Sequence, residues 1–129
     1  TTDVPLREKA AGTVTSLTPG HIAFAGAGTA THLGKYTEVG SNDFDDQGHI
    51  FNGQFVITAA DGSTISGTYS GTYTPLESGK IQFNVTATYT IGTGRLAGVT
   101  GYSNIVAVLD ELAPGAALQY TGLGTLVVP

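Results

Sequence analysis

The chain has 129 residues, enough for one domain with a modest core; 40% of them are apolar and only 12% are charged. The net charge of −5 and the five scattered basic residues exclude the basic patches that attract nucleic acids and anionic membrane surfaces. The absence of cysteine excludes disulfides and thiolate chemistry. We therefore expect a single domain over residues 1–129 that binds neither nucleic acid nor membrane.

In chain order, we interpret residues 1–9 as an N-terminal extension. Strands are then predicted at 11–17, 21–30 and 32–40, and the first two are separated by a turn at Thr18-Pro19-Gly20. The acidic stretch 42–48 follows. Its three carboxylates could suit calcium, but the spacing lacks the glutamate at position twelve of a calcium loop, which favours an acidic hairpin turn.

Alternation with a period of two dominates the middle of the chain. One face of 51–59 carries Phe51, Phe55, Ile57 and Ala59. Residues 64–73 and 81–91 each have one face of hydroxyl or amide side chains, and their other faces carry Ile65, Tyr69, Tyr73, Ile81, Phe83, Val85, Ala87, Tyr89 and Ile91. The Asp61-Gly62 pair between the first two strands is typical of a tight hairpin, because both residues tolerate positive φ.

The remaining elements are strands at 102–111 and 116–128, turns at 75–79 and 114–115, and one short helical turn at Gly94–Gly98. Eight one-sided strands with short connections favour an all-β, antiparallel, up-and-down barrel. Closure of such a barrel removes the exposed strand edges that invite aggregation. Its interior is just wide enough for side chains or one small ligand.

Aromatic residues on the predicted inner faces are the candidate ligand-contacting groups: Tyr36, Phe55, Tyr69, Tyr73, Phe83, Tyr89 and Tyr120. A buried tyrosine provides an apolar wall with one hydrogen-bonding tip, which suits an amphipathic small molecule. Two interpretations stay open. The inward glycines either relieve strain in the coiled wall around a packed core, or leave room for a ligand cavity.

Glu38 is the single candidate for acid–base chemistry. If Tyr36 faces the interior, Glu38 does too, and a buried carboxyl group could act as a general acid or base. If Leu33 and Val39 face inward instead, Glu38 is solvated. The three histidines, at spacings of 11 and 17, match no metal-binding motif, so we predict neither a metal site nor a cofactor.

Two glycine-rich segments carry a resemblance to a known family. They read GTATHLGKYT over residues 28–37, followed by a turn and Gly48, and IGTGRLAGVTG over residues 91–101. The second segment resembles the glycine-patterned crossing of allene oxide cyclase-like barrels. That group includes plant allene oxide cyclases, dirigent proteins, spirotetronate-type cyclases and many exported bacterial proteins of unassigned function.

The resemblance implies an eight-stranded, calycin-like barrel with a short helical turn at Gly94–Gly98, often assembled as a homodimer or homotrimer. In the family's enzymes a hydrophobic cavity folds a flexible substrate, without metal or cofactor. The polar groups differ between its branches, so no residue of this chain is assigned a catalytic role by the resemblance.

The function we expect is therefore a barrel that binds a small apolar ligand. The alternatives are a cofactor-free cyclase or isomerase, which needs a buried Glu38, and a structural barrel with a filled core. The charge-poor, Thr- and Gly-rich composition and the start at Thr1 favour a secreted or periplasmic protein.

Overall fold

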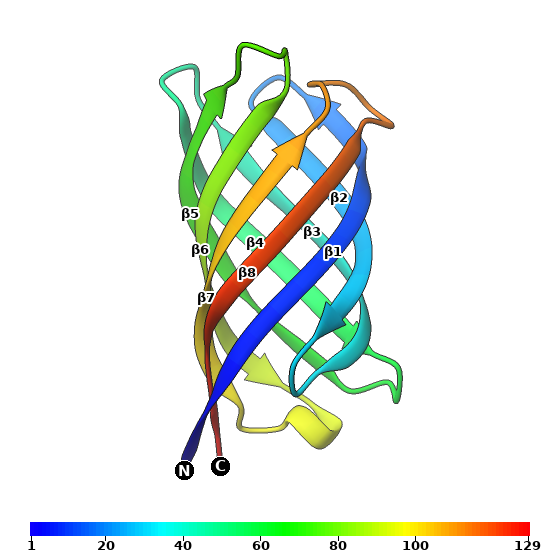
Figure 1. Ribbon diagram of the computed structural model, residues 1–129, viewed down its shortest axis with the longest axis vertical. Helices are drawn as coiled ribbons and strands as arrows, with labels where there is room; N and C mark the ends of the chain where they lie inside the picture. Colours follow the sequence, from blue (N-terminus) through cyan, green and yellow to red (C-terminus); the bar gives the residue numbers. More distant parts are fainter.

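Eight antiparallel strands follow one another around a closed barrel in the computed structural model, which describes residues 1–129 (Figure 1). They are β1 (Thr2–Thr18), β2 (His21–Ala30), β3 (Gly34–Phe44), β4 (His49–Ala59), β5 (Thr64–Pro75), β6 (Ile81–Gly92), β7 (Thr100–Leu109) and β8 (Ala117–Val128). A single 3₁₀ turn, η1 (Gly94–Leu96), connects β6 to β7. The predicted fold class and the short helical turn are confirmed. No helix is long and apolar enough to cross a membrane.

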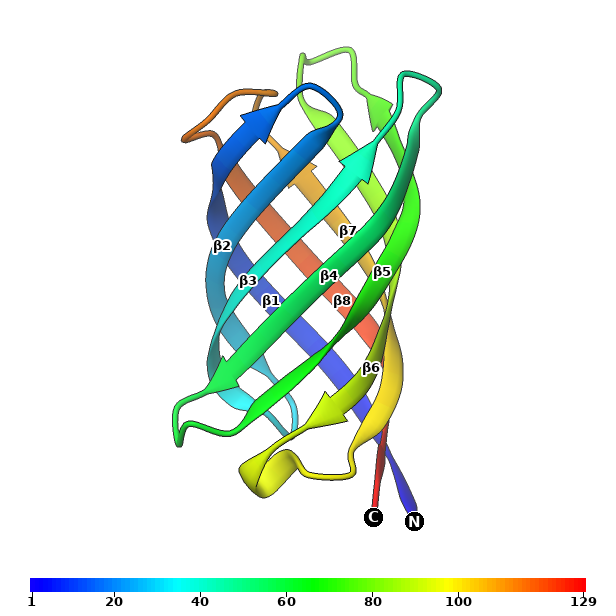
Figure 2. The same ribbon diagram turned by 180° about the vertical axis from the view of Figure 1, so that it is seen from behind.

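The barrel has two different ends (Figures 1 and 2). The upper end carries the loops at 19–20, 45–48, 76–80 and 110–116. The lower end carries both chain termini, the connections at 31–33 and 60–63, and η1. The loops at both ends are short, as expected for consecutive antiparallel strands.

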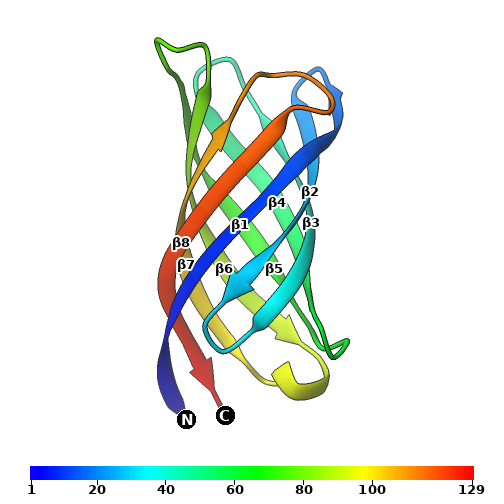
Figure 3. The same cartoon turned by 45° about the vertical axis from the view of Figure 1, so that its right-hand side comes forward.

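The barrel closes through β1 and β8, which lie side by side in Figure 3. Their pairing runs from Thr2 opposite Val128 to Thr13 opposite Ala117. The interpretation of residues 1–9 as an extension is therefore wrong, because most of them form the lower half of β1. Leu6 and Ala10 point inward and are buried, and Glu8 lies between them on the same face.

Two β-bulges correct the predicted faces. Asn52 has φ +52°, and the register between β4 and β5 shifts between Ile50 and Gly53. Ile50 is therefore buried and Phe51 exposed, contrary to the expected inward face of Phe51. A second bulge, between Ser66 and Gly67, turns the side chain of Ile91 outward, where 64% of its surface is exposed.

Other boundaries shift by a few residues. His32 has φ +69° and lies in a turn, and β3 begins at Gly34 and continues to Phe44, through the first part of the predicted acidic turn.

In the remaining turn, the Asp45 carboxylate accepts hydrogen bonds from the backbone N–H groups of Gln47 and His49. This bonding is typical of an Asx turn. No group of three acidic or histidine side chains is placed to hold a metal ion.

The lower half of the barrel is a closed and mostly apolar core. Its fully buried side chains are Leu6, Leu33, Ile57, Ile65, Leu96, Val99 and Leu126. Leu96 comes from η1, so the 3₁₀ turn contributes to the seal at this end. The upper half differs, because inward-facing Phe24, Tyr69, Phe83 and Ile105 are only partly buried.

Arg95 joins the two glycine-rich segments at the lower end. Its guanidinium group donates hydrogen bonds to the carbonyl oxygens of His32 (2.9 Å) and Leu33 (3.3 Å). It also donates to the Asp61 carboxylate (3.1 Å), in the connection between β4 and β5. A planar guanidinium can reach several acceptors at once, so one side chain ties three connections together.

Candidate functional site

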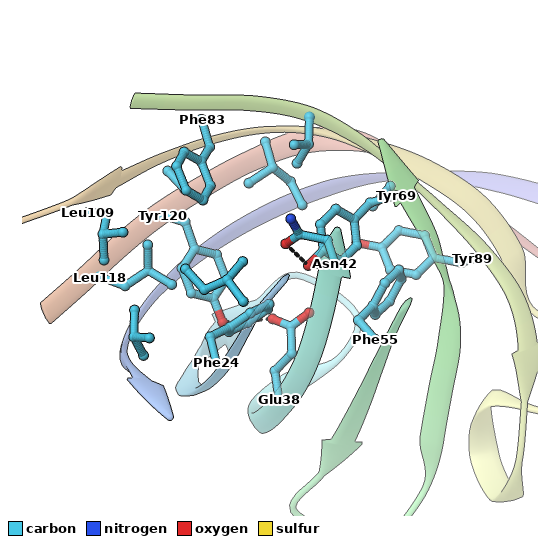
Figure 4. A pocket seen from close by; sticks show the side chains of 16 residues that line it. Phe24, Glu38, Asn42, Phe55, Tyr69, Phe83, Tyr89, Leu109, Leu118 and Tyr120 are labelled. Atoms are coloured by element: carbon cyan, nitrogen blue, oxygen red, sulfur yellow. Dashed lines mark hydrogen bonds between the residues drawn. The ribbon is translucent and has the colours of Figure 1, made fainter. Parts of the chain in front are cut away.

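A cavity occupies the upper half of the barrel interior, and all eight strands contribute side chains to it (Figure 4). Its enclosed space is about 60 Å³. Fourteen of its sixteen lining residues are hydrophobic, and the other two are Glu38 and Asn42. The enclosed space is well below the ~300–1,000 Å³ of ordinary ligand pockets, so the closed part suits only a small group.

Most of the predicted ligand-contacting residues line this cavity: Phe55, Tyr69, Phe83, Tyr89 and Tyr120. Tyr73 does not. It lines a second, smaller cavity of about 30 Å³ nearer the upper rim, which shares Ile22, Asn42 and Phe83 with the first. Tyr36 lines neither cavity, because its hydroxyl group points to Glu8. Phe24 completes the aromatic lining, and sequence reasoning did not select it.

Glu38 faces the interior, so the ambiguity of its strand is resolved. The register places it opposite Gly26 and Ile57, and only 7% of its surface is exposed. The hydroxyl of Tyr120 donates a 2.7 Å hydrogen bond to Glu38 Oε1. No protein group donates to Oε2, and Glu38 lines the cavity, as Figure 4 shows.

Burial raises the pKa of Glu38 from 4.5 to about 8. The hydrogen bond from Tyr120 acts in the opposite direction, and the nearby carboxyl group of Glu8 raises the pKa further. At neutral pH, Glu38 is therefore mostly a neutral carboxylic acid that can both donate and accept hydrogen bonds.

A second buried carboxyl group, Glu8, was missed because its segment was interpreted as an extension. It is 5% exposed, and burial raises its pKa above the ordinary value. The hydroxyl of Tyr36 donates to Oε2 (3.0 Å), and that of Ser103 donates to Oε1 (3.4 Å). The alternating apolar residues Val4, Leu6 and Ala10 could have indicated the inward face of a strand. The charged residue at position 8 interrupts this pattern.

Two glycines leave room for these polar groups. A Cβ atom on Gly26 would lie 2.7 Å from the Tyr120 hydroxyl, and one on Gly122 would collide with the Glu8 carboxyl group. Close approach requires glycine at both positions. These inward glycines leave space for polar side chains that lie against the inner surface of the barrel. This is a third role, beside the two considered from the sequence.

Asn42 completes the polar lining near the upper rim. Its Oδ1 accepts a 2.7 Å hydrogen bond from the hydroxyl of Tyr69, and its Nδ2 donates to the carbonyl oxygen of Asp43. Both ends of the amide are thus occupied by the protein. Among the carboxyl and amide oxygens at the cavity, Oε2 of Glu38 is then the one that accepts no hydrogen bond from the protein.

No family model, curated protein or solved structure matches this chain. The resemblance to allene oxide cyclase-like barrels therefore stays a prediction, and the geometry of the cavity is the basis for assigning a function.

Proposed function

We propose that the barrel binds a small, mostly apolar molecule that enters at the upper end and places one polar group against Glu38. The observation that carries this proposal is a cavity sealed below and partly open above, with the free Oε2 of one buried carboxyl group. Apolar walls with few polar groups are typical of small-molecule sites, where the polar groups fix orientation.

The size of the cavity limits the ligand. About 60 Å³ accommodates a polar head and a short apolar segment, and a longer tail extends between Phe24 and Phe83 towards the rim. The partial exposure of these two rings, although both face the interior, supports entry from that side.

A cofactor-free isomerase or cyclase is the second candidate. The pKa of Glu38 is about 8, which is close to neutral pH. A general acid works well when its pKa lies near the working pH. This activity would use the same cavity, so it also depends on ligand binding.

The test is to fill the cavity. Ala107 lines it and Val106, its neighbour on β7, faces the solvent, so Ala107→Leu and Val106→Leu form a matched pair. We expect n-hexanol to shift the NMR signals of cavity residues in the wild type and in Val106→Leu. In Ala107→Leu the affinity should fall by at least about tenfold. If n-hexanol does not bind the wild type, or binds Ala107→Leu equally well, the proposal is wrong and the barrel has a structural core.

A further inference from the structure

The two buried carboxyl groups have no cationic partner in the protein. All five lysine and arginine side chains lie on the exposed surface: Arg7, Lys9, Lys35, Lys80 and Arg95. Of the histidines, His21 and His49 pair with Asp43 and Asp45, and His32 lies in an exposed turn. The interior therefore contains no cationic side chain. Ionisation of a buried carboxyl group is costly unless a positive charge compensates it.

The groups that face Glu38 are all neutral or acidic. They are Glu8 on β1, Tyr36 on β3 with Glu38 itself, Tyr69 on β5, Tyr89 on β6 and Tyr120 on β8. The pKa values of all four tyrosines are raised by burial and by the charges of the glutamates, so their hydroxyl groups stay protonated. The protein therefore supplies hydrogen bonds to Glu38 but no positive charge.

The upper end of the barrel is acidic. Its loops and strand ends carry Asp43, Asp45, Asp46, Glu77, Asp110 and Glu111. The only lysine or arginine at this end is Lys80, which pairs with Asp110 at 3.4 Å. A negative rim around an apolar entrance raises the local concentration of cations.

The cavity walls also suit a cation with an apolar body. Six of the lining residues are aromatic: Phe24, Phe55, Tyr69, Phe83, Tyr89 and Tyr120. Aromatic faces attract ammonium groups that have lost part of their water. Their area also provides the contact that an alkyl or aryl body needs.

We propose that the ligand is a small organic cation, a primary amine on an apolar body, whose ammonium group pairs with Oε2 of Glu38. This inference rests on the proposed ligand binding and names the chemical class of the ligand. The ammonium group supplies the positive charge that Glu38 needs in order to ionise inside the barrel, and the acidic rim lies on the route of the ligand into the cavity.

Pairing releases a proton. Near neutral pH the ligand arrives as R–NH₃⁺ and Glu38 is mostly protonated, so the ion pair forms when the carboxyl proton passes to the solvent. No covalent bond to the ligand forms or breaks. Binding of the amine is then tighter at higher pH, until the amine itself loses its charge.

The experiment compares three probes of equal chain length, n-hexylamine, n-hexanol and hexanoate, by titration calorimetry at pH 7 in two buffers with different ionisation enthalpies. We expect the amine to bind at least about tenfold more tightly than the alcohol, with release of about one proton. Hexanoate should bind most weakly. Glu38→Gln should still bind the alcohol, but lose both the preference for the amine and the proton release.

The matched control is Asp3→Asn, a carboxylate-to-amide exchange on the exposed lower part of β1, which should leave both signals unchanged. Equal binding of alcohol and amine by the wild type, or amine binding without proton release, would overturn this inference and leave the proposed function intact. If none of the three probes binds, the proposed function fails, and this inference fails with it.

Discussion

The carboxyl group of Glu38 couples the stability of the barrel to pH. Its pKa is about 8 in the folded protein and 4.5 without burial, so the folded state holds a proton that the unfolded chain releases between these values. Stability is therefore fully present below the lower value and falls as pH rises towards the upper one. At about 1.4 kcal/mol per pKa unit, the loss amounts to several kcal/mol.

The measurement is the free energy of unfolding in urea at a series of pH values. Glu38→Gln keeps the shape of the side chain without its titration, so its stability should fall much less from mildly acidic to mildly alkaline pH. A smaller decrease should remain, because Glu8 is also buried and its pKa is raised. Parallel profiles for the wild type and Glu38→Gln would show that Glu38 does not titrate as expected.

Tyr120 controls the acidity of Glu38 through one hydrogen bond. Its hydroxyl group stabilises the ionised carboxylate, so Tyr120→Phe should raise the pKa of Glu38 above that of the wild type. The shift is measurable by NMR titration of the labelled glutamate carboxyl carbon. Tyr102→Phe removes a hydroxyl from an exposed tyrosine and should leave the titration unchanged. A pKa that stays constant or falls in Tyr120→Phe would contradict this account.

At the residue scale, the sequence predicted aromatic faces well and buried charges poorly. The inward faces of Tyr69 and Tyr89 follow from strict alternation with hydroxyl-bearing neighbours. Glu8 could not be selected in this way, because a charged residue in an alternating segment looks like a solvated position. Its burial depends on Tyr36, Ser103 and the space left by Gly122, which lie far away in the chain.

At the scale of the elements, β-bulges caused the wrong face assignments. Alternation counts every residue as one step, so an inserted residue reverses the faces on one side of it. Phe51 and Ile91 lie beyond such insertions, and their apolar side chains gave no indication of the reversal. The hairpin at Asp61-Gly62 was predictable, because its turn residues determine the connection locally.

The 3₁₀ turn η1 helps to seal the lower end through Leu96, which is fully buried. Leu96→Ala should lower the free energy of unfolding by about 2–5 kcal/mol, because it removes core contacts and leaves a cavity. Leu123→Ala, on the outer wall where 61% of the leucine is exposed, is the control and should change stability little. Urea unfolding followed by circular dichroism measures both. Equal losses for the two variants would show that η1 does not contribute to the core.

Arg95 makes an independent contribution at the same end. Arg95→Lys keeps the charge but cannot reach His32, Leu33 and Asp61 together, so it should destabilise the barrel by roughly 1–3 kcal/mol. Lys35→Arg, an exchange in the opposite direction at an exposed position, is the control. The measurement is the midpoint of thermal unfolding. If Arg95→Lys unfolds at the same temperature as the wild type, the three hydrogen bonds do not hold the connections together.

For the whole molecule, the distribution of charge agrees with a barrel that works from one end. No lysine, arginine, aspartate or glutamate lies within β4 to β8, and six of the ten acidic residues lie at the upper rim. Strands β4 to β8 thus form a neutral wall, and the loops at the upper end carry negative charge around the entrance. This polarity is visible only in the fold, because the acidic positions are dispersed along the sequence.

Closure of the barrel depends on the residues interpreted from sequence as an extension. Removing residues 1–7 would leave the segment of β8 from Leu123 to Val128 without its partner and would take Leu6 out of the core. The lost hydrogen bonds, at about 1 kcal/mol each, and a buried leucine, at roughly 1.5–3 kcal/mol, together form a large part of the stability of a small domain. The truncated chain should therefore unfold at a clearly lower temperature.

The truncation should also change the state of association, because an unpaired edge of β8 can accept a strand from another chain. Circular dichroism measures the midpoint of thermal unfolding, and size-exclusion chromatography with light scattering measures the mass. Removal of Thr1 alone, which lies outside β1, is the control and should leave the midpoint and the mass of the full chain unchanged. A truncated chain with the same midpoint and mass as the full chain would show that the lower half of β1 is dispensable, and that β2 to β8 hold the barrel without it.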